Sequence, residues 1–340
     1  MKVGYAVLYE DGTLVISANP IKQFKKFSIL SLRKNIYKDY GKFDDDNVPW
    51  KREYNKIKRV RILDQVKSNC MKKWFENCKN LKTLIDFQNL DVSDCENFSC
   101  LFYGCQALKD ISSLKEWNVS SGKDFSNMFY SCKSLQDLKG LQIWDVSNGK
   151  DFSFMFDSCK SLQDLKGLQN WNVSNGKDFS HMFYFCKSLM DISALTNWDV
   201  SNGINFSLMF SNCESLKNIT ALTNWDVSNG KNFYGMFAYC KKLLDVLALL
   251  NWNVSNGEDF SNMFDGCKFL INIEMENWNM SNGKYFTEMI CNCICLQTIQ
   301  LPNTLKRLNE DIFTKCNPSL KISWKGKVYT YDDLIAYQEF

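Results

Sequence analysis

The chain repeats itself every 27 residues. A Met-Phe pair marks each copy and recurs at this interval, at Met128-Phe129, Met155-Phe156, Met182-Phe183, Met209-Phe210, Met236-Phe237 and Met263-Phe264. Leu101-Phe102 precedes the series by the same interval as a degenerate copy, and Met289-Ile290 follows it after 26 residues. A fixed period of this length is typical of solenoids, in which one repeat cannot bury its apolar face alone and stacks on its neighbours. The sequence therefore predicts a stack of coils.

The first half of one copy, Asp151–Lys177, has the period of a helix. Its apolar residues stand at i, i+3, i+4 and i+7, as Phe152, Met155, Phe156 and Cys159. This spacing places them on one helix face and does not match the alternation of a strand. We therefore expect a short helix over residues 152–160. Because two to three turns are too short to be stable alone, packing against neighbouring coils must hold it.

The second half of the copy carries Leu162, Leu165, Leu168, Trp171 and Val173. We expect a short strand near Ser161–Leu165 and a second extended piece around Trp171–Val173, although the Leu spacing is not clean β alternation. The Trp recurs in successive copies and predicts a buried column, at Trp117, Trp144, Trp171, Trp198, Trp225, Trp252 and Trp278. The predicted fold class is α/β, a leucine-rich-repeat-like solenoid of 27-residue coils, each with a short strand and a short helix.

Both ends of the chain depart from the repeat and predict caps, which solenoids need to cover their apolar ends. Tyr5–Ser17 indicates a hairpin around Asp11-Gly12, and Ile57–Asp64 indicates the first strand of the stack. Ser323–Tyr331, with Lys325-Gly326 at its turn, indicates a closing hairpin, and Asp332–Phe340 a terminal helix. We therefore divide the chain into an N-terminal cap with the first strand (1–80), a repeat solenoid (81–298) and a C-terminal atypical repeat with its cap (299–340).

Composition narrows the classes of partner. The net charge is +3 and 23% of the residues are charged, so no polyelectrolyte partner is implied and we expect no nucleic acid. The sequence has no apolar run of 18 residues that could span a membrane. The start at Met1 shows no signal peptide, which leaves a cytoplasmic location open. We expect a monomer that binds a protein partner.

The fifteen cysteines follow the repeat rather than any metal motif. Ten share the position of Cys159, at Cys78, Cys105, Cys132, Cys159, Cys186, Cys213, Cys240, Cys267, Cys293 and Cys316. We expect small buried hydrophobes there, because helices packed about 8–10 Å apart are too distant for disulfides, which need about 4.4–6.8 Å between Cα atoms. The dense run Cys291–Cys295 lacks both Cys-x-x-Cys spacing and a nearby His.

Two further patterns could indicate chemistry. An Asp/Asn column raises the alternative of calcium, but turn formation among abundant lysines explains it more simply; its members are Asp110, Asp137, Asp164, Asp191, Asn218, Asp245 and Asn272. The chain has one His, His181, at an outward position where sibling copies carry other residue types, so no Ser-His or Cys-His nucleophile is indicated. We expect no catalytic residues, no metal and no cofactor.

The pattern Trp-Asp/Asn-Val-Ser-Asn-x-x-x-Phe-Ser-x-Met-Phe-x-x-Cys-x-Ser-Leu resembles the repeat of BspA-like leucine-rich-repeat surface proteins. Gly149 stands where that family usually carries Val, and Phe152 where it often has Met. The resemblance implies a non-enzymatic, protein-binding solenoid, with a surface adhesin or host-interaction protein at the cell surface as the specific expectation. The alternative is an intracellular structural or scaffold repeat protein with no surface role.

Partner recognition is expected at outward positions, because these vary between copies while the core columns do not. Phe154, His181 and Leu208 share one such position. Phe185 and Tyr239 share a second, and Tyr130 and Tyr184 a third. Exposed aromatic residues grouped in this way are typical of interfaces.

Overall fold

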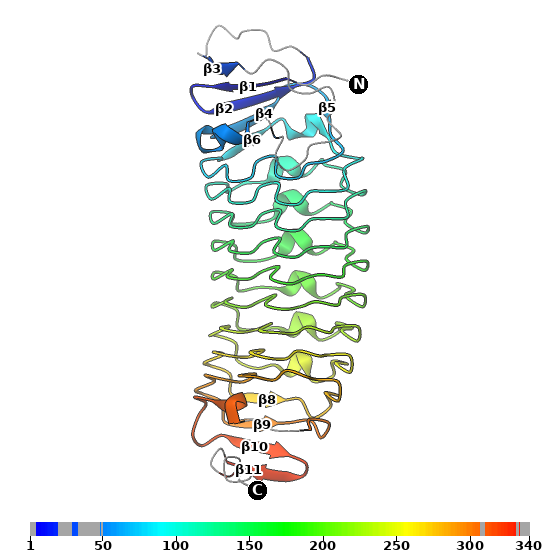
Figure 1. Cartoon of the computed structure of the whole chain (residues 1–340), viewed down its shortest axis with the longest axis vertical. Coiled ribbons are helices and arrows are strands. Elements are labelled where there is room, and N and C mark those ends of the chain that lie inside the picture. The colour runs from blue at the N-terminus through cyan, green and yellow to red at the C-terminus, as the bar shows by residue number, and fades with distance from the viewer. Residues whose placement is uncertain are drawn as a thin grey trace. The chain divides into compact units, whose positions relative to one another are not determined.

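The computed structural model describes residues 5–19, 29–32, 48, 50–306, 310–330 and 333. Its internal contacts divide the chain into two compact units. The N-terminal unit contains residues up to Leu162 together with Lys166–Val173, and the C-terminal unit contains Gln163–Leu165 together with residues from Ser174 onward. Within each unit, coils stack on one another (Figure 1). The expected boundaries at residues 80 and 298 remain predictions.

The N-terminal unit begins with the predicted hairpin, which is confirmed. Strands β1 (Tyr5–Tyr9) and β2 (Thr13–Ser17) pair antiparallel, with Val7 opposite Val15. The turn closes where the N–H of Gly12, at φ +85°, donates to the carbonyl of Tyr9 at 2.9 Å. Glycine adopts this left-handed conformation without the clash that a Cβ atom would cause.

A five-stranded sheet grows from this hairpin (Figure 1). Strand β3 (Ile29–Leu32) pairs antiparallel with β1 on one side. On the other side β4 (Arg59–Ile62), the predicted first strand of the stack, runs parallel to β2, and β6 (Thr83–Ile85) runs parallel to β4. The same region contains the 3-10 helices η1 (Lys51–Lys56) and η2 (Phe87–Asn89), and the parallel pair β5 (Val66–Lys67) and β7 (Leu90–Asp91).

Residues 152–160 do not form a helix, so the predicted short helix in each coil is wrong. The backbone makes consecutive turns, in which the N–H groups of Met155, Asp157 and Cys159 donate to carbonyls three residues earlier at 3.1–3.3 Å. Phe154 and Ser158 have φ of +57° and +60°, which an α-helix does not contain. In the same segment of sibling coils, alternate N–H groups donate to the next coil.

The spacing of the coils explains this correction. Backbone hydrogen bonds join neighbouring coils, for example from Phe129 N–H to the Met155 carbonyl at 2.9 Å. Coils joined in this way lie about 4.8 Å apart, whereas packed helices need about 8–10 Å. The predicted apolar face is nevertheless correct, because the turns direct the same side chains inward, and Phe152, Met155, Phe156 and Cys159 are fully buried.

Residues 161–165 do not form the expected strand. Only Asp164 makes a β-bridge there, parallel to Asp191. A 3-10 turn follows it, and no strand is assigned over the expected second extended piece, Trp171–Val173. With three residues per turn, this 3-10 turn accounts for the spacing between Leu165, just before it, and Leu168 at its end. The same turn recurs from coil to coil, as η3 (Ser112–Leu114), η4 (Lys139–Leu141), η5 (Lys166–Leu168), η6 (Ser193–Leu195), η7 (Thr220–Leu222) and η8 (Leu247–Leu249).

The core consists of the predicted columns. Phe129 stacks on Phe156 with ring centroids 5.5 Å apart and planes 2° from parallel. Trp144 and Trp171 stack at 6.4 Å, and the indole N–H of Trp171 donates to the carbonyl of Leu141, 30 residues earlier, at 2.9 Å. Burying each indole therefore leaves its polar atom paired, as packing of Trp requires.

The cysteine column is buried as expected except at Cys316, which is partly exposed, and the argument against disulfides needs another basis. Coils at hydrogen-bonding distance are close enough for disulfides, so the argument from helix spacing does not hold. Thiols of the column instead point at a carbonyl of the preceding coil: Cys159 Sγ lies 3.2 Å from Phe129 O, and Cys213 Sγ 3.2 Å from Phe183 O. Burial raises the pKa of both thiols well above the usual value, which keeps them protonated and unreactive.

The C-terminal unit ends in a four-stranded sheet of order β11-β10-β9-β8 (Figure 1). Strands β8 (Asn272–Glu274), β9 (Thr298–Gln300) and β10 (Lys321–Trp324) are parallel, and the 3-10 helix η9 (Glu310–Phe313) lies between β9 and β10 in the chain. Strand β11 (Lys327–Tyr329) pairs antiparallel with β10, which confirms the closing hairpin. Apart from Asp333, the expected terminal helix at 332–340 lies outside the described residues.

Candidate functional site

The predicted partner-binding residues belong to three sets of equivalent positions in the turn segments of the coils, which we call the first, second and third surface columns. The first contains Phe154, His181 and Leu208, with Asn127, Gly235 and Asn262 as their equivalents in other coils. The second contains Phe185 and Tyr239, with Ser131, Ser158, Asn212 and Gly266. The third contains Tyr130 and Tyr184, with Tyr103, Asp157, Ser211, Ala238 and Asp265.

The first two columns have left-handed backbone. Phe154, His181 and Leu208 have φ of 56–57°, and Phe185 and Tyr239 have φ of 58°. This region favours Gly and Asn, the residue types that several sibling coils carry, and costs a bulky side chain roughly 1–2 kcal/mol. Such strain in bulky residues tends to mark functional positions. The sequence indicated that these positions face outward, but not this conformation.

In the N-terminal unit, the third column forms a stacked aromatic pair. The rings of Tyr103 and Tyr130 lie 4.5 Å apart between centroids and 4° from parallel. Both side chains are half-buried, as is Phe154. Asp157 takes the equivalent place and is only 3% exposed. Burial raises the pKa of its carboxyl to about 7, against which a 2.7 Å hydrogen bond from Ser158 Oγ acts.

In the C-terminal unit, one coil brings together residues from all three columns. The His181 ring lies 5.4 Å from that of Tyr184, and Tyr184 stacks against Phe185 at 5.7 Å. Lys187 Nζ lies 4.5 Å above the Phe185 ring, a cation–π contact. Burial lowers the pKa of His181 below its usual value, while Asp178 acts against this shift. The imidazole is therefore neutral at physiological pH and contributes an aromatic surface.

The next two coils continue this surface. The Leu208 side chain lies across Gly235 of the following coil, where an added Cβ atom would meet it at 2.7 Å. Tyr239 lies across Gly266 in the same way, also at 2.7 Å, and is 40% exposed. Asp265, which accepts a hydrogen bond from the Tyr239 hydroxyl, raises the pKa of that hydroxyl to about 12. Bulky side chains alternate here with glycines that let them lie flat.

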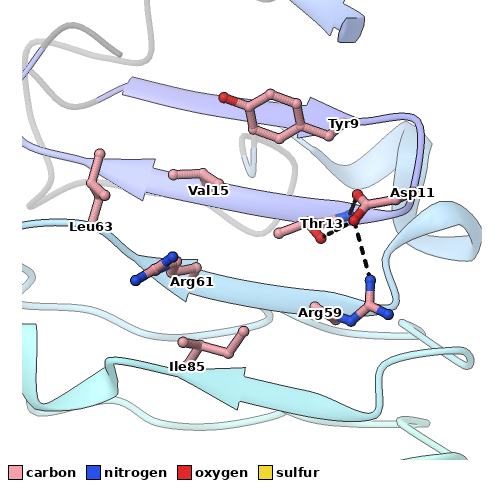
Figure 2. Close-up of a pocket in the computed structure, with 8 residues that line it drawn as sticks. All are labelled: Tyr9, Asp11, Thr13, Val15, Arg59, Arg61, Leu63 and Ile85. Carbon is pink, nitrogen blue, oxygen red and sulfur yellow. Dashed lines mark hydrogen bonds and ion pairs between the residues drawn. The ribbon is translucent and has the colours of Figure 1, made fainter. Parts of the chain in front are cut away.

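A pocket that the sequence did not reveal lies on the sheet of the N-terminal unit (Figure 2). It has a volume of about 300 Å³ and is lined by Tyr9, Asp11, Thr13, Val15, Arg59, Arg61, Leu63 and Ile85. Its two arginines are neutralised, because Arg59 pairs with Asp11 at 3.2 Å and Arg61 with Asp86 at 2.8 Å. The sequence signal for a buried site here was the continuous run of apolar residues in β1 and β2. Strands that are buried on both faces do not alternate apolar and polar residues.

The Asp/Asn column has the turn role expected for it. Asp110 Oδ1 accepts the N–H of Ser112 at 2.8 Å, and Asp191 and Asn218 accept those of Ser193 and Thr220 in the same way. These bonds start the 3-10 turns. Within the described ranges, no group of three or more His, Cys, Asp or Glu side chains is placed to hold a metal ion. The same part of the chain contains no helix with the length and apolarity needed to cross a membrane.

One protein-family model matches residues 68–194 and 186–301, the coils whose geometry is given above. It is DUF285, described as a Mycoplasma protein of unknown function. The chain belongs to the DUF285 family. No curated protein sequence matches this DUF285 chain.

Among solved structures, the DUF285 chain is similar to three bacterial proteins. A leucine-rich cell surface protein from Faecalibacterium prausnitzii is 15% identical with a TM-score of 0.41, over 97% of this chain and 95% of that one. A leucine-rich repeat protein from Eubacterium ventriosum is 14% identical with a TM-score of 0.34, over 93% of each chain. One from Bacteroides ovatus is 15% identical with a TM-score of 0.27, over 95% and 98%.

Proposed function

We propose that this chain is a non-enzymatic repeat protein that binds a protein partner through its surface columns. The observation that carries the proposal is the strained, bulky side chains of the first two columns. Leu208, Phe185 and Tyr239 adopt a left-handed backbone that Asn or Gly would adopt with less strain, and they hold aromatic or apolar surface toward solvent. Retaining such residues at a cost in stability is expected where they contact another molecule.

The chemistry of the columns favours a protein ligand. Tyr and Phe offer a large contact area with few rotatable bonds, and they are enriched at protein interfaces. In the C-terminal unit the contacting surface is apolar and aromatic, with Lys187 as its neighbouring cation. Neutral His181 adds no charge, and its ring lies against that of Tyr184. A reaction would need groups that these columns do not supply.

The specific form of this proposal is a surface adhesin or host-interaction protein, which the BspA-like repeat pattern supports. An intracellular scaffold is the second candidate. The same columns serve either role, so the two differ in location and not in binding chemistry. Labelling intact producing cells with an antibody against the chain separates them: surface signal without permeabilisation supports the adhesin, and signal only after permeabilisation supports the scaffold.

Binding is tested with one variant for each unit. The C-terminal variant combines Phe185→Asn with Tyr239→Asn, since Asn212 already occupies this column. The N-terminal variant combines Tyr130→Ser with Phe154→Asn, which match Ser211 and Asn127 of sibling coils. Each replacement keeps a residue that the repeat tolerates, so the coils are expected to remain folded.

A protein captured by the wild-type chain is purified and titrated against each variant. We expect at least one variant to lose about 100-fold or more in affinity, since aromatic hot spots often contribute 2 kcal/mol or more each. The matched control is Ile143→Asn, which removes a side chain that is 72% exposed and restores the Asn found in sibling coils. Unchanged affinity in both variants would show that the columns do not bind the partner.

A further inference from the structure

A cluster of exposed apolar side chains lies on two adjacent coils of the C-terminal unit, outside the three surface columns. Leu244 and Leu247 are 47% and 55% exposed, and Phe269 and Ile271 are 56% and 42% exposed. A parallel bridge between Asp245 and Asn272 joins the two coils beside these residues. We call Leu244, Leu247, Phe269 and Ile271 the apolar patch.

The patch is specific to these two coils. Where Phe269 stands, the coils before it carry Ser188, Ser215 and Lys242. Gln163, Met190 and Lys217 are equivalent to Leu244, so one earlier coil carries a single exposed apolar residue there. Ser193 and Thr220 are equivalent to Leu247. The fold therefore accepts polar residues at these positions, and the apolar ones are not needed for the core. Single exposed apolar residues are ordinary, but a group of four large ones on neighbouring coils indicates an interface.

Charges of both signs flank the patch. In each coil a lysine precedes the patch residues in the chain, as Lys242 and Lys268, and both lysines are exposed. An acidic residue stands further along each coil, as Asp245 and Glu274. In the part of the chain that the structure describes, no ion pair joins Lys242, Lys268 or Glu274 to another residue. Lys241 beside them shares Glu214 with Lys187, at 3.0 Å and 2.7 Å respectively. The patch thus has one basic and one acidic flank.

We propose that the apolar patch is the contact between two copies of this chain. In a two-fold dimer the same patch meets itself, so residue i of one copy contacts residue j of the other and the reverse. With the two patches face to face and their coils antiparallel, the basic flank of each copy meets the acidic flank of the other, while the four apolar side chains are buried between them. A uniformly charged partner, such as an anionic membrane surface or a nucleic acid, would meet like charge on one flank.

This proposal is independent of the partner-binding columns, and it replaces the monomer expected from the sequence. The four patch residues and their charged neighbours all belong to the C-terminal unit. A partner could therefore still reach the columns, because none of their members belongs to the patch.

The test measures association of the full chain by sedimentation velocity from about 1 to 100 μM. The wild-type chain is expected to shift from monomer to dimer over this range or to be dimeric throughout. The patch variant Leu244→Gln, Phe269→Ser and Ile271→Gln uses residue types found in sibling coils, and we expect its dimer dissociation constant to rise at least about 100-fold. The control Ile143→Asn removes an exposed apolar residue elsewhere and should leave association unchanged.

Charge reversal distinguishes this two-fold contact from unspecific apolar association. Lys268→Glu and Glu274→Lys should each weaken the dimer about 10-fold. In the two-fold arrangement residue 268 of each copy faces residue 274 of the other, so each change creates two pairs of like charges. The double variant restores opposite charges and should return to within about 3-fold of wild type. A wild-type chain that stays monomeric, a patch variant that still dimerises, or a double variant that is not rescued overturns the proposal. Unchanged circular dichroism confirms that each variant is folded.

Discussion

The ring of Phe152 occupies the space in which a Cβ atom of Gly149 would lie. The same relation holds in other coils, between Gly122 and Phe125, Gly203 and Phe206, Gly230 and Phe233, and Gly257 and Phe260. Gly and Phe therefore fit together as a pair, because the large ring requires the missing side chain.

This pairing predicts a non-additive double mutant. Gly149→Ala should lower the free energy of unfolding by about 1–3 kcal/mol, because the added methyl overpacks against the ring and backbone. Combining it with Phe152→Leu should cost at least about 1 kcal/mol less than the sum of the two single changes. Chemical denaturation of the four proteins measures this coupling. Lys150→Ala, exposed in the same loop, is the control and should have little effect; additive costs would contradict the pairing.

The repeat period and the inward phase of its side chains could be predicted from the sequence, whereas the backbone conformation could not. Phe152, Met155, Phe156 and Cys159 are buried as the spacing indicated. The spacing i, i+3, i+4, i+7 fits both a helix and a series of turns, and the choice depends on the distance between coils. That distance is set by hydrogen bonds to residues 26 positions away, as from Phe129 to Met155, which a local pattern does not contain.

For the candidate site, comparison between coils was the useful signal. It indicated the outward positions of Phe185 and Tyr239. Sibling coils carry Ser, Asn and Gly at that position, and Asn and Gly are the residue types that left-handed backbone favours. The apolar patch could have been found in the same way, because Phe269 stands where sibling coils carry Ser. For the pocket beside Tyr9, the apolar run of β1 and β2 indicates burial only, because the cavity itself depends on how β4 and the hairpin pack.

Asp157 predicts a pH dependence of stability. Burial raises its pKa to about 7 in the folded protein, from a usual value of 3.8. Between these two values Asp157 binds more protons in the folded state than in the unfolded state, so its contribution to stability is fully present below pH 4 and is lost as the pH rises toward 7. In Asp157→Asn we expect the free energy of unfolding to fall by about 1–4 kcal/mol less than in wild type between about pH 4 and pH 7. Denaturation at a series of pH values measures it, and an identical slope in the variant would mean that Asp157 is not the group responsible.

The left-handed columns predict that polar replacement does not destabilise the fold. Leu208→Asn relieves a bulky residue at φ +56° and gives it the residue type of Asn127 and Asn262 in the same column. The gain of roughly 1–2 kcal/mol should offset the lost contact with Gly235, leaving the melting temperature equal or higher. Leu216→Asn, at a buried position of the next segment, is the contrast and should unfold the coil. A lower melting temperature for Leu208→Asn would mean that packing at this column outweighs backbone strain.

The core columns predict that damage spreads locally. Phe183 is fully buried and stacks on Phe210 at 5.6 Å, so Phe183→Ala should cost about 3–5 kcal/mol as a large-to-small change. In a stack, each coil contacts only its neighbours, so coupling runs from coil to coil. Hydrogen exchange should therefore show lost protection centred near residue 183, extending into the coil of Phe210 and fading toward β8–β11. The control Ile143→Asn removes an exposed apolar side chain outside the patch and the core, and should change little. Uniform loss of protection along the chain would mean that the coils unfold as one cooperative core, and a silent Phe183→Ala would mean that the ring does not support the stack.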